Sequence, residues 1–272
     1  QGYGCSITVV PSASTPALAS VSETGEPDII TEVWTNGAPA YIPLLEAGKI
    51  NELTDVLSDG GVEGLWIPVY LAEAHPELLT IEGVLANPDL VGNRMHNCPV
   101  GWTCQVIATN VAKAGGFEAS GVEDFVHGSG ETLTASIASA YSSQEPWFGY
   151  YWSPSLVLGK YPMAKVELGS HDPAQQACNS DVNCASPTVQ NWPSSVVTTV
   201  VTDTFEASHP AEADVMRNLS FTNAMMNSLL AWQDENKATG DEAAVYFLST
   251  QQDIWKSWIN DSARSKLAAL LQ

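Results

Sequence analysis

The chain has 272 residues, of which 31 are Asp or Glu and only 10 are Lys or Arg, so its formal net charge is −21. A chain this acidic does not neutralise phosphates, which argues against nucleic acids and anionic membrane surfaces as partners. Apolar residues make up 44% and charged residues 15%, a balance typical of a folded protein and not of a disordered one. The sequence contains no apolar run long enough to span a membrane and no glycine-rich phosphate-binding motif.

The predicted elements alternate between strands and helices along the first two thirds of the chain. We expect strands at residues 6–10, 28–34, 64–69, 105–109, 147–152, 165–168 and 195–202. We expect helices at residues 16–23, 40–47, 129–142, 210–233, 241–249 and 252–271, with a helical turn at 75–77. Ser129 or Gly130 caps the helix at 129–142, and Glu131 lies in its first turn. This alternation predicts an α/β fold with parallel sheets.

Four of the five cysteines form two pairs, and the members of each pair are six residues apart. This spacing is wrong for a zinc site, and both intervening stretches are rich in turn residues. We therefore expect two disulfides, Cys98–Cys104 and Cys178–Cys184, and with them an oxidising compartment such as the periplasm. Cys5 is left over, and its partner is expected outside the supplied sequence.

Nine tryptophans are present, although aromatic residues as a whole make up an ordinary 8%. Trp232, Trp255 and Trp258 lie at amphipathic positions of the predicted C-terminal helices, where packing explains them. Others occur at strand ends and in loops, where the ligand crevice of an α/β sheet lies. Several tryptophan faces together bind a methylated ammonium ion, so an aromatic box is the alternative to simple packing.

Three segments carry a specific resemblance. They are residues 25–34, ending in Val-Trp; residues 98–104, with Gly-Trp-x-Cys; and residues 145–154, with Tyr-Tyr-Trp-x-Pro. Their order and spacing resemble the substrate-binding proteins of ABC transporters for glycine betaine, proline betaine and related methylated amines, over roughly residues 2–260. The sequence looks like a trimethylamine N-oxide-binding member.

The resemblance implies a two-lobed α/β periplasmic binding protein of type II-like architecture, with the ligand in a cleft between lobes joined by a hinge. The first lobe would comprise residues 1–67 and 195–272, and the second residues 68–194. It also implies an exported monomer that delivers a small methylated amine to a cognate ABC permease. Members of the family normally have a strand and a helix before the segment that begins at Gly2, so the supplied sequence is expected to lack them.

The resemblance also assigns residues to the ligand. Trp34, Trp102 and Trp152 would form the cage, with Trp147 as a fourth wall and Tyr151 beside Trp152. The backbone N–H groups of Thr103 and Cys104 could hold an anion.

The sequence departs from the family pattern at two positions. The His that often grips a betaine carboxylate is replaced by Ala38, and Glu131 begins a helix that would point at the cleft. Glu131 is either a solvated helix-start carboxylate or a ligand contact. As a contact it would repel a betaine carboxylate and suit choline or trimethylamine N-oxide, whose oxygen a protonated Glu131 could bind.

A second site is suggested by the loop between the last two cysteines, where oxygen-bearing side chains alternate. Asn179, Asp181 and Asn183, with Asp172 nearby, resemble the start of a Ca²⁺ loop but lack its glycine and distal glutamate. A structural Ca²⁺ and a solvated turn are the two interpretations. No cofactor is required for the predicted function.

Two other function classes remain. A carbohydrate-active enzyme would use a carboxylate pair from Glu123, Asp124, Glu131 and Glu145, but no hydrolase motif is present and the five histidines are scattered. A chemoreceptor module could bind the same ligand without a transporter. A glycine betaine or choline specificity is the alternative within the resemblance itself.

Overall fold

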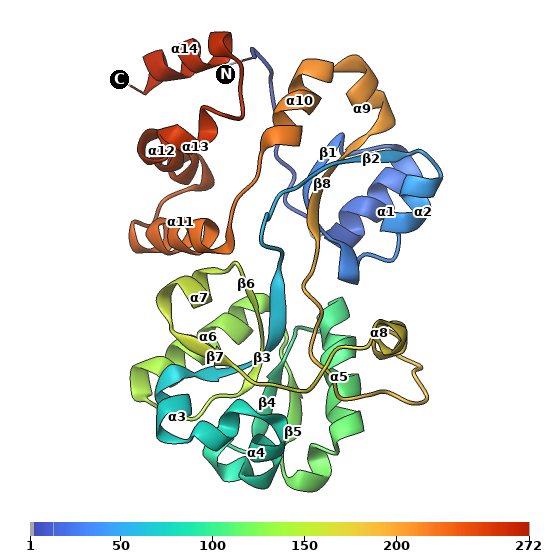
Figure 1. Cartoon of the computed structure of the whole chain (residues 1–272), viewed down its shortest axis with the longest axis vertical. Helices are drawn as coiled ribbons and strands as arrows, with labels where there is room; N and C mark the ends of the chain where they lie inside the picture. The colour runs from blue at the N-terminus through green and yellow to red at the C-terminus, as the bar shows by residue number, and fades with distance from the viewer. Residues whose placement is uncertain (1–2, 13, 272) are drawn as a thin grey trace. The chain divides into compact units, whose positions relative to one another are not determined.

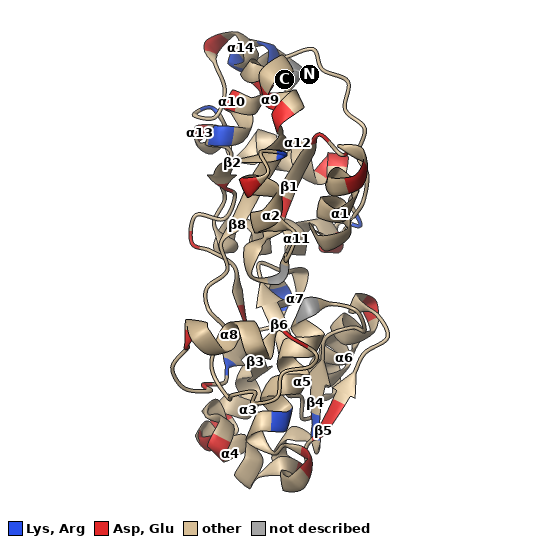
Figure 2. Cartoon of the chain, turned by 90° about the vertical axis from the view of Figure 1, so that its right-hand side faces the viewer, with Lys and Arg blue, Asp and Glu red and all other residues tan. Residues whose placement is uncertain are grey.

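The computed structural model describes residues 3–12 and 14–271. The chain divides into two compact units (Figure 1), residues 1–61 with 195–272 and residues 62–194. Residues 62–67, expected in the first lobe, belong to strand β3 (Val62–Pro68), and both partner strands of β3 lie in the second unit. Asp and Glu residues are spread over both units, with few Lys and Arg among them (Figure 2). Within the described chain, none of the helices combines the length and apolarity that crossing a membrane takes.

The first unit is built on a three-stranded sheet of order β1-β8-β2. Strand β8 (Val197–Thr202) is buried along its whole length and pairs antiparallel with both β1 (Ile29–Trp34) and β2 (Ile50–Asp55). Helices α1 (Ser14–Thr24) and α2 (Tyr41–Glu46) cover this sheet through a shared apolar core. The expected parallel sheet is therefore wrong for this unit.

Short helices follow β8 and complete the first unit. They are α9 (Asp203–Ser208), α10 (Pro210–Asn218), α11 (Asn223–Glu235), α12 (Gly240–Thr250), α13 (Gln252–Trp255) and α14 (Asp261–Leu270). The single helix expected at 210–233 is interrupted at Phe221, whose backbone N–H donates to Val56 and whose carbonyl accepts from the backbone N–H of Ser58. Phe221 also packs against Phe247 and Trp258, and this tertiary contact overrides the local helical pattern.

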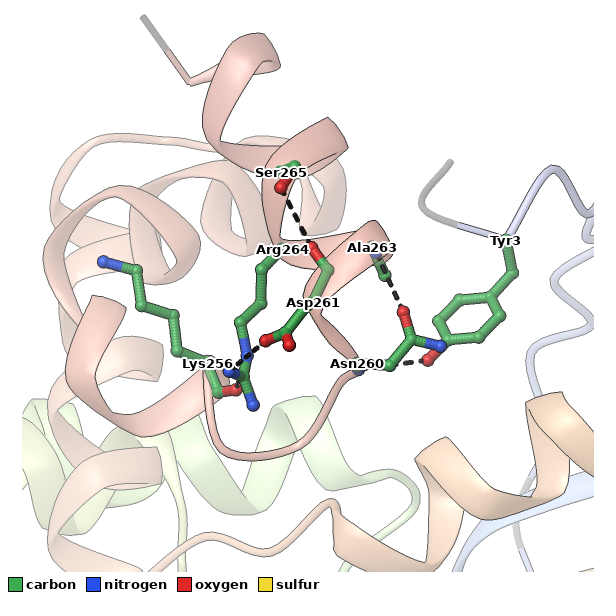
Figure 3. A network of polar contacts seen from close by, with 7 residues as sticks. All are labelled: Tyr3, Lys256, Asn260, Asp261, Ala263, Arg264 and Ser265. Carbon is green, nitrogen blue, oxygen red and sulfur yellow. Dashed lines mark hydrogen bonds and ion pairs between the residues drawn. The ribbon is translucent and has the colours of Figure 1, made fainter.

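The segment that precedes α1 contacts the C-terminal helices through Tyr3. The backbone N–H of Asn260 lies 3.5 Å from the Tyr3 hydroxyl, and the Asn260 side chain caps α14 (Figure 3). The strand expected at residues 6–10 is wrong. This stretch has no strand structure, and Ile7 and Val9 are 78% and 81% exposed.

The second unit holds a five-stranded mixed sheet of order β5-β4-β6-β3-β7. Strand β4 (Arg94–Asn97) is parallel to β5 (Glu123–Val126) and to β6 (Gly149–Ser153), whereas β3 is antiparallel to β6 and to β7 (Met163–Lys165). Parallel pairing, expected throughout, is thus confined to three strands. Two of these strands, β4 and β5, were not predicted. Strand β2 of the first unit was not predicted either.

Helices cover both faces of this sheet. One core joins Leu65 and Tyr150 to α4 (Ile81–Ala86) and α5 (Thr103–Gly115), and another joins their strand neighbours Trp66 and Tyr151 to α6 (Gly130–Ser143) and α7 (Leu156–Lys160). The strand expected at 105–109 lies inside α5, because its short apolar run continues at helical spacing to Val111. The remaining helices are α3 (Val69–Ala74), α8 (Pro173–Asn179) and the 3₁₀ turns η1 (Thr35–Gly37), η2 (Pro76–Leu79), η3 (Pro88–Val91) and η4 (Glu118–Ser120).

Candidate ligand-binding site

Three parallel strands of the second unit bring three predicted ligand residues to one edge of its sheet. Strand β4 runs into the loop that contains Trp102, β5 runs into the start of α6 at Glu131, and β6 itself carries Trp152. Because the carboxyl ends of parallel strands meet at the same edge, these segments lie together. This edge of the second unit is the candidate site.

Trp102 and Trp152 are in direct contact. Their rings meet edge to face with centroids 5.6 Å apart, and Trp102 is 40% exposed. Trp102 also lies over the start of α6, since a Cβ atom at Gly130 would be only 3.3 Å from its ring. The Cys98–Cys104 disulfide closes the loop around Trp102, which is the N-cap of α5. The expected disulfide therefore holds an exposed tryptophan in place.

Tyr151 extends this aromatic surface. Its ring stacks on Trp152 with a centroid distance of 4.5 Å and an interplanar angle of 15°. Its hydroxyl shares a hydrogen bond of 2.9 Å with the Thr134 hydroxyl of α6, and burial raises the Tyr151 pKa. Tyr151 itself is buried, so it supports the Trp152 ring from behind.

Glu131 lies in the first turn of α6, next to Gly130, and its side chain is exposed. Hydrogen bonds from the Ser129 side chain and from its own backbone N–H lower the Glu131 pKa. The carboxylate is thus ionised at neutral pH in this structure. The expectation of a desolvated and protonated Glu131 does not describe the protein without its ligand.

Trp147, the expected fourth wall, lies in the core instead. It is 1% exposed, its ring stacks on His96 at 5.3 Å, and its Nε1–H donates to the Ser136 hydroxyl at 2.9 Å. A side chain enclosed in this way offers no free ring face to a ligand. Trp147 lies one residue before the fully buried Phe148, at the entry to β6, and this position places it in the core.

Trp34 belongs to the first unit, where it ends β1. Its Nε1–H donates to the Glu32 carboxylate at 2.6 Å, and its ring lies directly over Gly61, where an added Cβ would come within 2.2 Å. Ala38, four residues later, is buried in the core of that unit. A ligand contact at Trp34 stays a prediction.

The first turn of α5 supplies the backbone groups expected to hold an anion. Thr103 and Cys104 are its first two residues, so their N–H groups lie at the positive end of the helix dipole. Anion binding at these N–H groups also stays a prediction.

The second disulfide, Cys178–Cys184, is also formed, and a calcium ion bound by the loop that it closes stays a prediction. The Asn179 side chain is buried, and both of its polar atoms bond the backbone of Thr188. Asp172 caps α8, and Asp181 accepts from the backbone N–H of Asn183. These oxygens serve the fold of the loop. Among the described residues, no group of three His, Cys, Asp or Glu side chains could hold a metal.

One pair of residues at this site was missed. His96 of β4 and His127, directly after β5, contact each other, although the five histidines are scattered along the sequence. The signal is their register: His96 is paired with Phe125, so His127 lies two positions further on the same face. Without the two short strands this relation could not be recognised.

Several solved structures share this fold. An ABC-transporter choline binding protein, solved with choline, is 16% identical, with 96% of this chain and 86% of that one covered and a TM-score of 0.69. A lactococcal OpuAC, solved closed with glycine betaine, is 16% identical over 95% and 89% of the chains, with a TM-score of 0.70. ProX from Borrelia burgdorferi, a glycine/betaine/L-proline-binding protein, is 17% identical over 94% and 87%, with a TM-score of 0.68.

The family relationship follows from the sequence match. Residues 1–250 match the model of the substrate-binding domain of ABC-type glycine betaine transport systems. The solved relatives agree with it in fold, an α/β periplasmic binding protein with two sheets. The chain therefore belongs to this family: it is the extracytoplasmic solute-binding component of an ABC importer for quaternary ammonium compounds, and not an enzyme.

Proposed function

We propose that the chain captures trimethylamine N-oxide in the periplasm and delivers it to its ABC permease. The observation that carries this proposal is the exposed carboxylate of Glu131 beside the Trp102 and Trp152 pair. Aromatic ring faces attract a methylated nitrogen, and each face contributes roughly 0.5–2 kcal/mol. The carboxylate determines which polar group the ligand can carry beside its methylated nitrogen.

The oxygen of the N-oxide is negatively polarised, so it can lie beside Glu131 only if one proton is shared between them. An N-oxide oxygen has a basicity similar to that of a carboxylate, which makes such sharing chemically balanced. Because the Glu131 pKa is lowered, the proton belongs mainly to the ligand. The bound species is then a hydroxylated trimethylammonium cation that donates a hydrogen bond to an ionised Glu131.

Choline is the second candidate, and the ionised state of Glu131 favours it. Its hydroxyl donates to a carboxylate without any proton uptake, and one solved relative was determined with choline. Glycine betaine is disfavoured, because its own carboxylate would be repelled by Glu131. Trp34 is included in the proposed cage on the strength of the resemblance alone.

Isothermal titration calorimetry separates these ligands. Trimethylamine N-oxide, choline, glycine betaine and dimethylsulfoniopropionate are titrated in buffers of different ionisation enthalpy. We expect tight binding of the N-oxide with uptake of close to one proton, choline binding without uptake, and weak betaine binding. Glu131→Gln should weaken N-oxide binding about tenfold or more, since a charge-assisted hydrogen bond is lost.

The matched control is Glu82→Gln, which removes a first-turn carboxylate from α4 in the same unit. It should leave all four affinities unchanged. Betaine binding tighter than both N-oxide and choline would overturn the proposed ligand. Absence of heat with every compound would overturn the aromatic cage itself.

A further inference from the structure

His96 and His127 form a paired unit directly behind the candidate site. His96 Nδ1 lies 2.9 Å from His127 Nε2, and the two rings stack with centroids 5.2 Å apart. His127 is only 6% exposed. Trp147 also stacks on His96, and Phe125 meets both imidazoles edge to face. The pair is therefore held rigidly by aromatic contacts.

The hydrogen bonds around His127 determine which atom donates and which accepts in the series His96–His127–Thr132. The Thr132 hydroxyl donates its single proton to the Ser129 carbonyl at 2.8 Å, so toward His127 it can only accept. His127 Nδ1, 3.2 Å away, must then carry a hydrogen. In a neutral imidazole Nε2 is consequently the acceptor, and His96 Nδ1–H donates to it. Both histidines are neutral, with defined tautomers.

This series of hydrogen bonds leads to the two segments that carry the predicted ligand residues. Thr132 and Ser129 form the capping box of α6, and the Ser129 side chain bonds Glu131. The His127 carbonyl accepts from the backbone N–H of Val100 at 3.1 Å, inside the disulfide loop and two residues before Trp102. His127 thus contacts the start of α6 through its ring and the Trp102 loop through its backbone.

We propose that His127, oriented by His96, is a positioning residue that holds Glu131 and Trp102 in the arrangement in which both contact the same bound ligand. The inference rests on the proposed function, because it assigns a task to the pair only if these two residues bind the ligand. His127 acts through its neighbours and does not itself contact the ligand.

A proton on His127 Nε2 would reverse the arrangement, because Nε2–H is then a donor and His96 Nδ1 can accept from it only after giving up its own hydrogen. Burial lowers the pKa of both histidines, that of His96 to about 3. Arg94, whose guanidinium lies 4.3 Å above the Phe125 ring, disfavours a further positive charge. The other charged groups on the adjoining elements are Glu123, which pairs with Arg94, Asp124, which bonds Asn97 and Thr109, and Glu131.

The test measures choline and trimethylamine N-oxide affinities of two matched variants by calorimetry. His127→Asn places an amide donor near Nδ1 and keeps the bond to Thr132, whereas His127→Gln reaches toward Nε2 and loses it. We expect His127→Gln to weaken binding about fivefold to tenfold and His127→Asn to stay within about twofold of wild type. His75→Gln, a histidine on an exposed turn of the same unit, should bind like wild type.

The pH profile of choline binding is the second readout, because choline does not titrate. Wild-type affinity should be constant above neutral pH and fall as the pH drops through the lowered pKa of His127. His127→Asn should lack this fall. Thermal melts identify any variant that loses binding by unfolding, and a lost affinity at an unchanged Tm supports positioning.

Four results would overturn the inference. If both variants bind like wild type, or if the acid-dependent fall persists in His127→Asn, the pair does not position the site. Equal losses of affinity in the two variants at equal Tm values would also contradict the inference, because only His127→Gln loses the bond to Thr132. If the wild-type protein binds neither choline nor the N-oxide, the proposed function fails and this inference fails with it. Wild-type binding with unaffected variants leaves the proposed function standing.

Discussion

Trp102 and Trp152 meet edge to face, with 5.6 Å between ring centroids, although α5, β5 and α6 lie between them in the chain. An edge-to-face pair places the electropositive ring edge of one tryptophan on the electronegative face of the other. The contact orients both rings without covering Trp102, which stays 40% exposed. Such an exposed and oriented ring is what a methylated cation requires.

Trp102→Ala should weaken the binding of choline and trimethylamine N-oxide about tenfold, because one cation–π face and its apolar contact are lost. Trp102→Phe should lose less. Calorimetry measures the affinities, and thermal melts should show only a small change, since Trp102 is 40% exposed and lies outside the buried core. Trp232→Ala is the control: it removes a ring stacked on Tyr246 in the first unit, so it should lower Tm and keep the affinity. A lowered Tm with unchanged affinity in Trp102→Ala, or a lost affinity in Trp232→Ala, would contradict the assignment of Trp102 to the ligand site.

Gly130→Ala should weaken ligand binding without destabilising the fold. The new Cβ would lie 3.3 Å from the Trp102 ring, so the ring must shift by a few tenths of an ångström. Alanine is the better helix former, which keeps the Tm equal or higher. Gly128→Ala is a matched control two residues earlier, because an added Cβ there meets nothing within 4 Å. We expect a severalfold loss of choline affinity in the first variant only, measured by calorimetry.

The two disulfides should differ in function but not in stability. Each closes a loop of the same length, so removing either one by a double Cys→Ser change should cost about 2 kcal/mol of unfolding free energy. Only the Cys98–Cys104 change should also lower ligand affinity, since only that loop carries Trp102. Denaturant titrations and calorimetry of the two double variants measure both effects. Equal affinities in the two would show that the disulfide does not hold the site.

Stability should fall as the solution becomes acidic. The pKa of His96, lowered by burial to about 3, and the lowered pKa of His127 mean that the unfolded chain binds these protons first as the pH decreases. The stabilisation is therefore complete above the unfolded pKa of about 6.5 and is lost progressively as the pH falls toward the folded values. Each proton contributes a slope of up to about 1.4 kcal/mol per pH unit.

Denaturant titrations between neutral pH and about pH 4 measure this slope. His96→Asn should flatten the profile, because it removes the most strongly shifted group while its amide can still donate to His127. An unchanged profile in this variant would assign the acid sensitivity to other groups.

The features that the sequence predicted well are local ones. The Ser129 cap of α6, the strand at β6 and both disulfides depend on neighbouring residues and are confirmed. The sequence does not predict strands β4 and β5, because each has only four residues of mixed polarity. Without these strands, the apolar run in α5 resembles a strand. The contact of His96 with His127 depends on pairing between those two strands, so no local pattern carries it. The burial of Trp147 was missed for the same reason.

Residues 94–153 form one uninterrupted stretch that contains β4, α5, β5, α6 and β6, and with them Trp102, Glu131 and Trp152. All its strands belong to one sheet, and the whole stretch lies in one unit. The wall of the site is thus encoded as a single genetic block. A recombination event that exchanges this block between family members would transfer Trp102, Glu131 and Trp152 together, whereas Trp34 of the first unit would be inherited separately.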